Sequence, residues 1–206
     1  MRDLNIRTVI DIGASKGGFS AELHGVLPEA QIYAFEPLSD CFAQIQERMK
    51  GVSKFRAFNL ALGDTPGKVV MHRSSYSGCS SLREMASLHK DTFPVTAGQE
   101  TISVAVSTLD EALSDYSLEE NIMVKIDVQG FEDKVIAGGL EMLKRSRVIL
   151  IETSFKELYV GQPLFDGVYH LLRSLGFQYR GAWAPELKSP LDGSPLQQDS
   201  IFIREG

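Results

Sequence analysis

The stretch VIDIGASKGGFS, residues 9–20, joins a short apolar run to a turn of small residues and then to the start of a helical pattern. A strand, a turn and a helix in this order form the nucleotide-binding end of open α/β sheets. The glycine spacing differs from that of the dinucleotide motif G-x-G-x-x-G, because with Gly13 as the first glycine the second position is Ser15 and only Gly18 matches. The turn therefore predicts a nucleotide site of another kind.

An acidic residue, Asp11, stands two residues before this turn. A carboxylate there would repel a pyrophosphate, whereas it would favour a nucleoside that carries a positive charge. S-adenosylmethionine is such a ligand, and we expect Asp11 to favour its cationic end. The small residues of the turn would let the backbone approach the ligand closely, and they are Gly13, Ala14, Ser15 and Gly17.

A second acid supports this site. The next apolar run, AQIYAFEP, ends in Glu36 and Pro37, and Glu36 lies 36 − 17 = 19 residues after Gly17. An acid at the tip of the second strand, about 20 residues beyond the glycine turn, accepts the ribose hydroxyls in nucleotide-binding folds. Ala61 and Leu62, in the turn after the third strand, are expected to contact the adenine. The alternative is that both acids merely satisfy backbone amides near helix starts.

Strand-like runs alternate with helical patterns along most of the chain. The pairs are residues 7–12 with 17–27, 30–36 with 39–50, 121–128 with 131–145, and 147–153 with 164–176. This alternation predicts an α/β fold in which parallel strands are joined by crossover helices on both faces of one sheet. Two further runs, residues 177–183 and 200–205, predict an antiparallel hairpin that closes the sheet edge.

The least regular part of the sequence runs from about residue 65 to 116. Residues 67–73 and 101–106 resemble two extra strands, and the segment between them is rich in Ser, Gly and small polar residues. A connection of this length inside a compact domain is usually a functional lid or disordered, and its aromatic residues favour a lid. We therefore expect one domain, residues 1–206, with a lid-like insertion around residues 65–116.

Composition narrows the function classes. The net charge of −6 over 206 residues counts against non-specific binding to nucleic acid or anionic membranes. No apolar run approaches the roughly 18 residues that a membrane span needs, and the first residues, MRDLNIRTVID, have no apolar signal-peptide region. A cytoplasmic location is therefore expected. The two cysteines, Cys41 and Cys79, are too few for a tetrahedral cysteine metal site.

Six motifs in a fixed order resemble those of the FkbM-type S-adenosylmethionine-dependent methyltransferases: VIDIGASKGGFS, AFEPLSD, NLALGD, STLDEAL, MVKIDVQGFEDKVIAGG and VILIE. The most specific part is STLD followed by KIDVQGFE. The resemblance implies a Rossmann-like class I methyltransferase fold with a mostly parallel seven-stranded sheet and an antiparallel last strand. It also implies S-adenosylmethionine as cofactor and O-methylation of a hydroxyl on a sugar or another natural product. Gln129 departs from the family, which usually has glutamate there.

Transfer of a methyl group to an alcohol requires alignment of the reactants and removal of the hydroxyl proton. Asp127 and Glu152 end two neighbouring strands, at the edge where open α/β sheets bind ligands. We expect Asp127 to accept or orient the hydroxyl, with Glu152 assisting, and His89 in the insertion is a further candidate base. Alternatively, Asp127 caps the next helix, or both carboxylates hold Mg²⁺. Lys125 either reaches one of these acids or extends into solvent.

Two rival functions are open from the sequence. One is a nicotinamide-dependent oxidoreductase, which Asp11 and the missing second glycine disfavour. The other is a catalytically silent nucleotide-binding module, for which Gln129 is the hint. The sequence leaves the identity of the acceptor and the oligomeric state open, and we expect a hydroxylated small molecule, such as a saccharide, rather than a nucleic acid.

Overall fold

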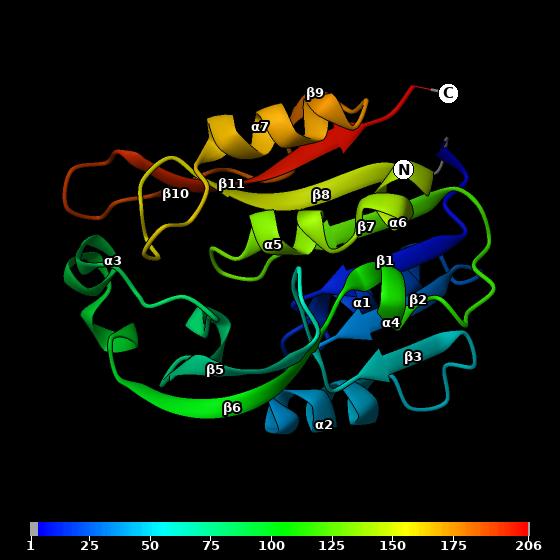
Figure 1. The fold of residues 1–206 in the computed structure, drawn as a ribbon, viewed down its shortest axis with the longest axis horizontal. Coiled ribbons are helices and arrows are strands. Elements are labelled where there is room, and N and C mark those ends of the chain that lie inside the picture. Colours follow the sequence, from blue (N-terminus) through cyan, green and yellow to red (C-terminus); the bar gives the residue numbers. More distant parts are fainter. Residues whose placement is uncertain (1–3, 206) are drawn as a thin grey trace.

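The computed structural model describes residues 4–205, which form one large sheet and one small sheet (Figure 1). The large sheet has the order β10-β11-β8-β7-β1-β2-β3, and β9 also pairs with β11. Its strands are β1 Thr8–Ile12, β2 Gln31–Phe35, β3 Phe55–Phe58, β7 Ile122–Ile126, β8 Ser146–Ser154, β9 Gln178–Ala182, β10 Leu187–Lys188 and β11 Pro195–Ile203. Residues 1–3 and 206, the ends of the expected domain, lie outside the described residues.

The strand directions confirm the predicted fold class. Strands β3, β2, β1, β7 and β8 run parallel to one another. Strand β11 runs antiparallel to both β8 and β9. The sheet has eight strands instead of seven because the two-residue strand β10 pairs with the outer edge of β11.

Helices cover both faces of the large sheet (Figure 1). They are α1 Gly18–Val26, α2 Ser39–Arg48, α4 Leu109–Ala112, α5 Glu132–Ala137, α6 Leu140–Arg145 and α7 Phe165–Ser174. Alternate residues of a strand point to opposite faces of the sheet. On one face, Val9 belongs to a buried cluster with Leu23 of α1 and Ile45 of α2. On the other face, Ile10 belongs to a cluster with buried residues of α4, α5, α6 and α7. Both faces are therefore buried, as parallel strands require.

One predicted helix, residues 131–145, is broken in two. Gly138 lies so close to the preceding loop that a Cβ atom there would be 1.9 Å from the carbonyl oxygen of Gly63. A Cβ atom on Gly139 would lie 2.9 Å from the side chain of Leu109. The sequence prediction was wrong on this point because tertiary packing, and not helix periodicity, ends α5 here.

The expected insertion contains the small sheet. Strand β6 (Gln99–Ser107) lies between β4 (Ala61–Leu62) and β5 (Gly67–Ser74), and β5 and β6 are antiparallel. The segment between β5 and β6 contains η2 Ser77–Cys79, α3 Ser87–Thr92 and η3 Pro94–Thr96. The small sheet packs on α2 through a buried cluster that includes Met71, Val104 and Cys41. A lid-like role for this segment stays a prediction.

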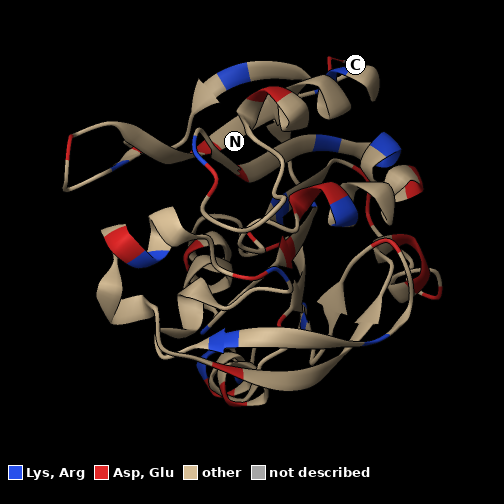
Figure 2. Cartoon of the chain, turned by 60° about the vertical axis from the view of Figure 1, so that its left-hand side comes forward, with Lys and Arg blue, Asp and Glu red and all other residues tan. Residues whose placement is uncertain are grey.

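The surface shows a mixed charge distribution. Figure 2 shows acidic and basic residues interspersed along the elements instead of separated onto opposite faces. Within residues 4–205, none of the helices combines the length and the apolar character that crossing a membrane requires. The cytoplasmic location stays a prediction.

The close contact at Gly138 gives a test of the fold. We expect Gly138→Ala to lower the free energy of unfolding by about 2–3 kcal/mol, because the added methyl group would force the Gly63 loop away. Gly25→Ala is the matched control, since Gly25 lies exposed in α1 with open space around it, and it should be neutral or more stable by about 0.5–1 kcal/mol. Urea unfolding of both variants measures the difference. Equal stability of the two would contradict this account of the helix break.

Candidate active site

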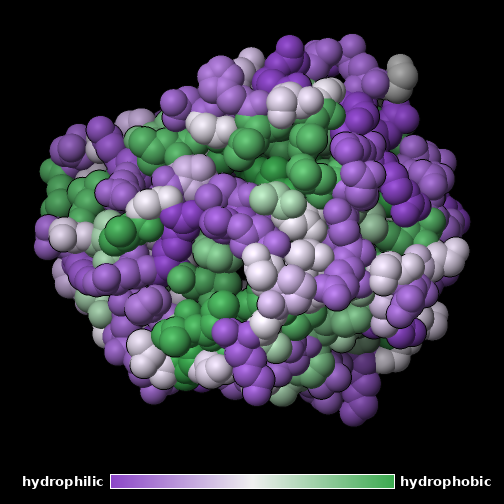
Figure 3. Space-filling view, in the orientation of Figure 1, coloured by the Kyte–Doolittle hydropathy of each residue, from purple (hydrophilic) through white to green (hydrophobic). Residues whose placement is uncertain are grey.

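A cleft opens at the carboxyl ends of β1, β2 and β7, and η2 of the insertion forms part of its wall. Several of the predicted residues line it, namely Gly13, Ser15, Glu36, Pro37, Ala61, Leu62 and Asp127. In Figure 3, hydrophobic patches alternate with hydrophilic groups over the face seen in Figure 1.

The turn after β1 is held against the ends of two neighbouring strands. Gly13 has a φ of 76°, and a Cβ atom there would lie 1.8 Å from the carbonyl oxygen of Asp127. The N–H groups of Gly13 and Ala14 both donate to the carbonyl of Phe35 at 3.0 Å. Ala14 and Gly17 therefore shape the turn without being among the described residues that line the cleft.

Glu36 joins the turn to the start of α2 and lies in the cleft wall. Its Oε2 accepts a hydrogen bond from the Ser15 N–H, and its Oε1 accepts one from the Leu38 N–H, each at 2.8 Å. Burial raises the pKa of Glu36 to about 7, although both of these bonds act in the opposite direction. The Glu36 carboxylate thus accepts hydrogen bonds from backbone amides, which is the alternative role considered from the sequence. It also lines the cleft.

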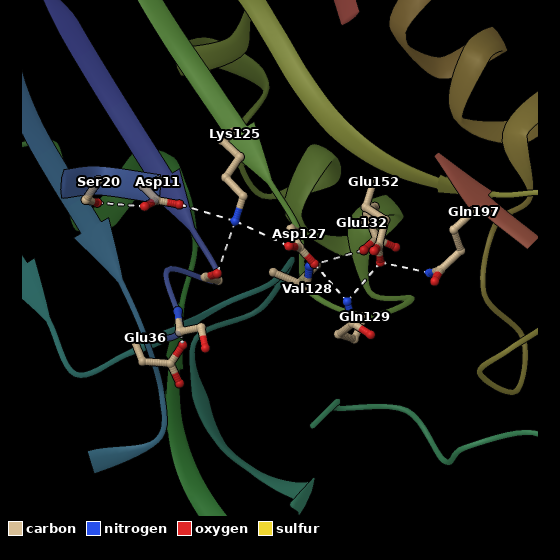
Figure 4. Close-up of polar contacts among 12 residues, drawn as sticks. Asp11, Ser20, Glu36, Lys125, Asp127, Val128, Gln129, Glu132, Glu152 and Gln197 are labelled. Atoms are coloured by element: carbon tan, nitrogen blue, oxygen red, sulfur yellow. Dashed lines mark hydrogen bonds and ion pairs between the residues drawn. The ribbon is translucent and has the colours of Figure 1, made fainter. Parts of the chain in front are cut away.

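Asp11, which we expected to favour the cationic end of the ligand, is fully buried beneath the turn and does not line the cleft. Its position on β1 points it to the face covered by α1, where the Ser20 hydroxyl donates to Oδ2 at 2.6 Å. Its Oδ1 lies 3.4 Å from Lys125 Nζ (Figure 4). Any effect of Asp11 on a ligand must therefore pass through Lys125 or through the electrostatic field.

Lys125 connects the first turn with the acids at the end of β7. Its Nζ lies 3.4 Å from Asp127 Oδ2 and donates to the Gly13 carbonyl at 3.2 Å (Figure 4). Burial alone would lower the pKa of Lys125, but the charges of Asp127 and Asp11 outweigh it and raise the pKa above its usual value. Of the two readings of this residue, the structure shows the one in which it reaches the acids.

Asp127 and Glu152 meet through a side chain that was not among the predicted site residues. Gln129 Nε2 donates to Asp127 Oδ1 at 2.8 Å and to Glu152 Oε2 at 2.9 Å (Figure 4). Gln197 Nε2 also donates to Glu152 Oε2 at 2.9 Å. Burial and the neighbouring charges of Asp127 and other acids raise the pKa of Glu152 well above its usual range. Asp127 lines the cleft, whereas Glu152 lies behind it.

Glu132, the first residue of α5, fixes the loop before this helix, whose N-cap residue has no side-chain capping bond. Its Oε1 accepts hydrogen bonds from the N–H groups of Val128 at 3.2 Å and Gly130 at 3.1 Å. Burial raises the pKa of Glu132 to about 7 against these bonds. The partners of the Asp127 carboxylate are instead Lys125 and Gln129, which frees Asp127 for a role in the cleft.

His89 is not brought into the cleft. It is buried in α3, where its ring packs edge-on against Tyr159 at 5.2 Å and Phe93 at 5.5 Å between centroids. Burial lowers its pKa. The sequence offered His89 as a further candidate base, but the structure places it on the inward face of a short helix, where it is a packing residue of the insertion.

Sequence reasoning missed most of the second layer of this site. Gln129 was noticed only as a departure from a family pattern, while Gln197 and Tyr159 lie in segments read as loop or left without a role. No local sequence pattern marks these three residues, because their side chains come together from segments far apart in the chain. Within the described part of the chain, no group of three or more His, Cys, Asp or Glu side chains is arranged to hold a metal ion.

Comparison with known proteins identifies relatives over most of the chain. The family model described as Methyltransferase FkbM domain matches residues 11–179. The 2-O-methyltransferase NoeI of Sinorhizobium fredii (strain NBRC 101917 / NGR234) is 32% identical over 173 residues, which cover 81% of this chain and 71% of the relative. Methyltransferase sdnD of Sordaria araneosa is 25% identical over 206 residues, with 86% and 77% covered.

A solved structure, the METTL16 MTase domain, matches with a TM-score of 0.54 and 14% identity over 100% of this chain and 65% of that chain. At this identity the likeness supports the fold alone, and it agrees with the Rossmann-like methyltransferase fold expected from the sequence.

The buried position of Lys125 gives a stability test. We expect Lys125→Met to lower the free energy of unfolding by about 3–5 kcal/mol near pH 7, because it leaves the carboxylates of Asp11 and Asp127 without their buried partner. Lys134→Met is the control, since Lys134 and Asp64 form an exposed pair whose loss should leave the free energy of unfolding nearly unchanged. Thermal or urea unfolding compares the two. Similar losses in both variants would argue against a buried charge network.

Proposed function

The chain belongs to the FkbM methyltransferase family, and from this premise we propose that it transfers a methyl group from S-adenosylmethionine to a hydroxyl group of a small molecule, such as a saccharide. The observation that carries the proposal is the cleft in which Glu36, at the end of β2, and Asp127, beyond the end of β7, line the same space. Open α/β sheets bind their ligands at this edge.

The residues of the cleft fit S-adenosylmethionine. The buried carboxylate of Glu36 lies where it can accept the ribose hydroxyls, and the turn at Gly13 and Ser15 offers closely approachable backbone. Ala61 and Leu62 provide an apolar wall with backbone polar groups for the adenine. When bound, the cofactor supplies a methyl group on a positively charged sulfur, which an oxygen nucleophile can accept.

The local charge favours a cationic cofactor. Asp11, Glu36 and Asp127 surround the first turn, and Lys125 balances only part of their charge. Asp11 contributes through this field and through its hold on Lys125, and not by direct contact. In a site from which water is partly excluded, such fixed charges act more strongly than they would in water.

Asp127 is the group that we propose to accept or orient the hydroxyl proton. Its side chain is 32% exposed, so that a ligand in the cleft can reach it, while Lys125 and Gln129 fix its two oxygens. Glu152 assists from behind through Gln129. The remaining task of the site is to hold the reacting groups in line and to exclude water.

One relative supports the proposed class of methyl acceptor. The name 2-O-methyltransferase, which the relative from Sinorhizobium fredii carries, supports a hydroxyl as the acceptor group. The family match does not favour a nicotinamide-dependent oxidoreductase. A silent binding module is not favoured either, because Gln129 bonds to both carboxylates instead of marking a lost site.

Cofactor binding should depend on pH through Glu36. Because burial raises the pKa of Glu36 to about 7, the free protein carries this proton below pH 7, whereas two ribose hydroxyls require the ionised carboxylate as acceptor. The affinity for S-adenosylhomocysteine should therefore fall roughly tenfold between pH 8 and pH 6 in calorimetry.

The variant Glu36→Gln tests whether Glu36 causes the pH dependence of S-adenosylhomocysteine binding. We expect the variant to bind about 10–100 times more weakly at pH 8, since it loses a charged acceptor, and to show a nearly flat pH dependence. Glu47→Gln on the exposed side of α2 is the control and should retain the wild-type profile. A Glu36→Gln variant that retains the wild-type pH dependence would remove Glu36 from the cofactor site.

Asp127→Asn tests the proposed base. Turnover with hydroxylated acceptors should fall at least about 100-fold, because an amide cannot accept the proton, while affinity for S-adenosylhomocysteine stays within about threefold. A methyl-release assay across sugars, glycolipids and polyketides measures turnover. Asp115→Asn, at an exposed position, is the control. Unchanged turnover in Asp127→Asn would refute the role of this residue but leave the cofactor site standing.

A further inference from the structure

Gln129 holds an unusual position between two acids. The amide nitrogen has two donor hydrogens, and its neighbours at hydrogen-bond distance are Asp127 Oδ1 at 2.8 Å and Glu152 Oε2 at 2.9 Å. Both hydrogens are therefore used, one on each carboxylate. A donor shared in this way allows two acids to lie close together without a proton between them.

The orientation of the amide is fixed by its other contacts. The hydroxyl of Tyr159 lies 2.8 Å from Gln129 Oε1 and donates to it, which leaves Nε2 on the side of the acids. The Ser81 hydroxyl donates to the Gln129 backbone carbonyl at 2.6 Å. Gln129 has a φ of 57°, and a Cβ atom on Gly130 would lie 2.8 Å from Tyr159 Cβ. These contacts hold Gln129 in a left-handed backbone conformation that residues other than glycine rarely adopt.

Charged and titratable groups surround this arrangement from every packed element. Those that face the pair are Lys125 of β7, Glu132 of α5, Asp199 of β11, Cys79 of η2 and Tyr159, which follows β8. Acids outnumber cations here, so the cluster must either bind protons or receive hydrogen bonds. Lys125 supports Asp127 directly, whereas the bonds on Glu152 come from the neutral amides of Gln129 and Gln197.

We propose that Gln129 is a positioning residue that keeps Asp127 ionised and directed into the cleft, so that a proton bound by the acid pair resides on Glu152. The inference deepens the proposed function and rests on it, since Asp127 needs this state to accept a proton from the acceptor. Glu152 Oε2 already accepts from two amides, and its proton therefore belongs on Oε1.

Gln129→Glu provides the sharpest test because it preserves size while it removes both donors and adds an acid. We expect the acid pair to bind one more proton near neutral pH. In a titration of the free protein followed by ¹³C NMR of labelled carboxyl groups, the signals of the pair should move to higher pH by about one unit or more. The acid limb of the turnover profile should move by the same amount, with activity recovered at higher pH.

Gln44→Glu is the matched control. It makes the same chemical change at an exposed position of α2, where the amide donates to the Asp40 carbonyl and contacts neither Asp127 nor Glu152, so the acid limb should stay within about 0.3 units of wild type. Equal shifts in both variants would overturn the proposal, as would a Gln129→Glu variant that loses activity equally at every pH without a shift in the titration.

A second variant covers failure of Gln129→Glu to fold. Gln129→Ala removes the two donors without adding charge, and its carboxyl titration should shift in the same direction by a smaller amount; an unshifted titration would also overturn the proposal. The titration needs neither cofactor nor acceptor. A wild-type protein that shows the expected titration but binds no S-adenosylhomocysteine would therefore refute the proposed function alone.

Discussion

A buried ammonium group holds the centre of this structure together. Lys125 extends from β7 to Asp11 of β1, to Asp127 at the end of its own strand, and to the carbonyl of Gly13. The same junction brings the turn after β1 so close to the end of β7 that only glycine fits at position 13. If this contact were lost, the turn, the carboxylate of Asp127 and the floor of the cleft would separate together. The stability of the sheet edge and the geometry of the site thus depend on one charge network.

Burial gives chemically similar carboxyl groups different roles. Glu132 is buried and accepts hydrogen bonds from backbone amides of residues 128 and 130, so it fixes the loop between β7 and α5. Glu152 is surrounded by other acids, which together with desolvation raise its pKa well above its usual range, and this suits a group that retains a proton. Asp127 keeps a lysine partner and an exposed edge, which suits a group that accepts one. Neighbouring acids with divergent environments are a common way to build acid and base functions from the same side chain.

The sequence predicted the features that depend on local pattern. The alternation of strands and helices, the antiparallel last strand, and the placement of Glu36 at the tip of β2 follow from periodicity and spacing. The direction of Asp11, the burial of His89 and the break at Gly138 depend on which face or which neighbour each residue meets, and no local pattern records that. Gln129 was visible only as an unexpected amide. Its meaning requires the register of β7 against β8 and the position of Tyr159, which are set by segments remote in the chain.

The insertion lines part of the cleft and also contacts Gln129. Ser77 and Ser80 line the cleft, Ser81 binds the backbone of Gln129, and Met85 pairs with Tyr159 beside the same residue. These contacts tie residues 77–85 to the acid pair, so this stretch cannot move away without disturbing Gln129. If the insertion acts as a lid, we therefore expect its remaining residues to carry the movement. Gln129 would then link such a movement to the alignment of Asp127, because Ser81 of the insertion and Asp127 both form hydrogen bonds with it.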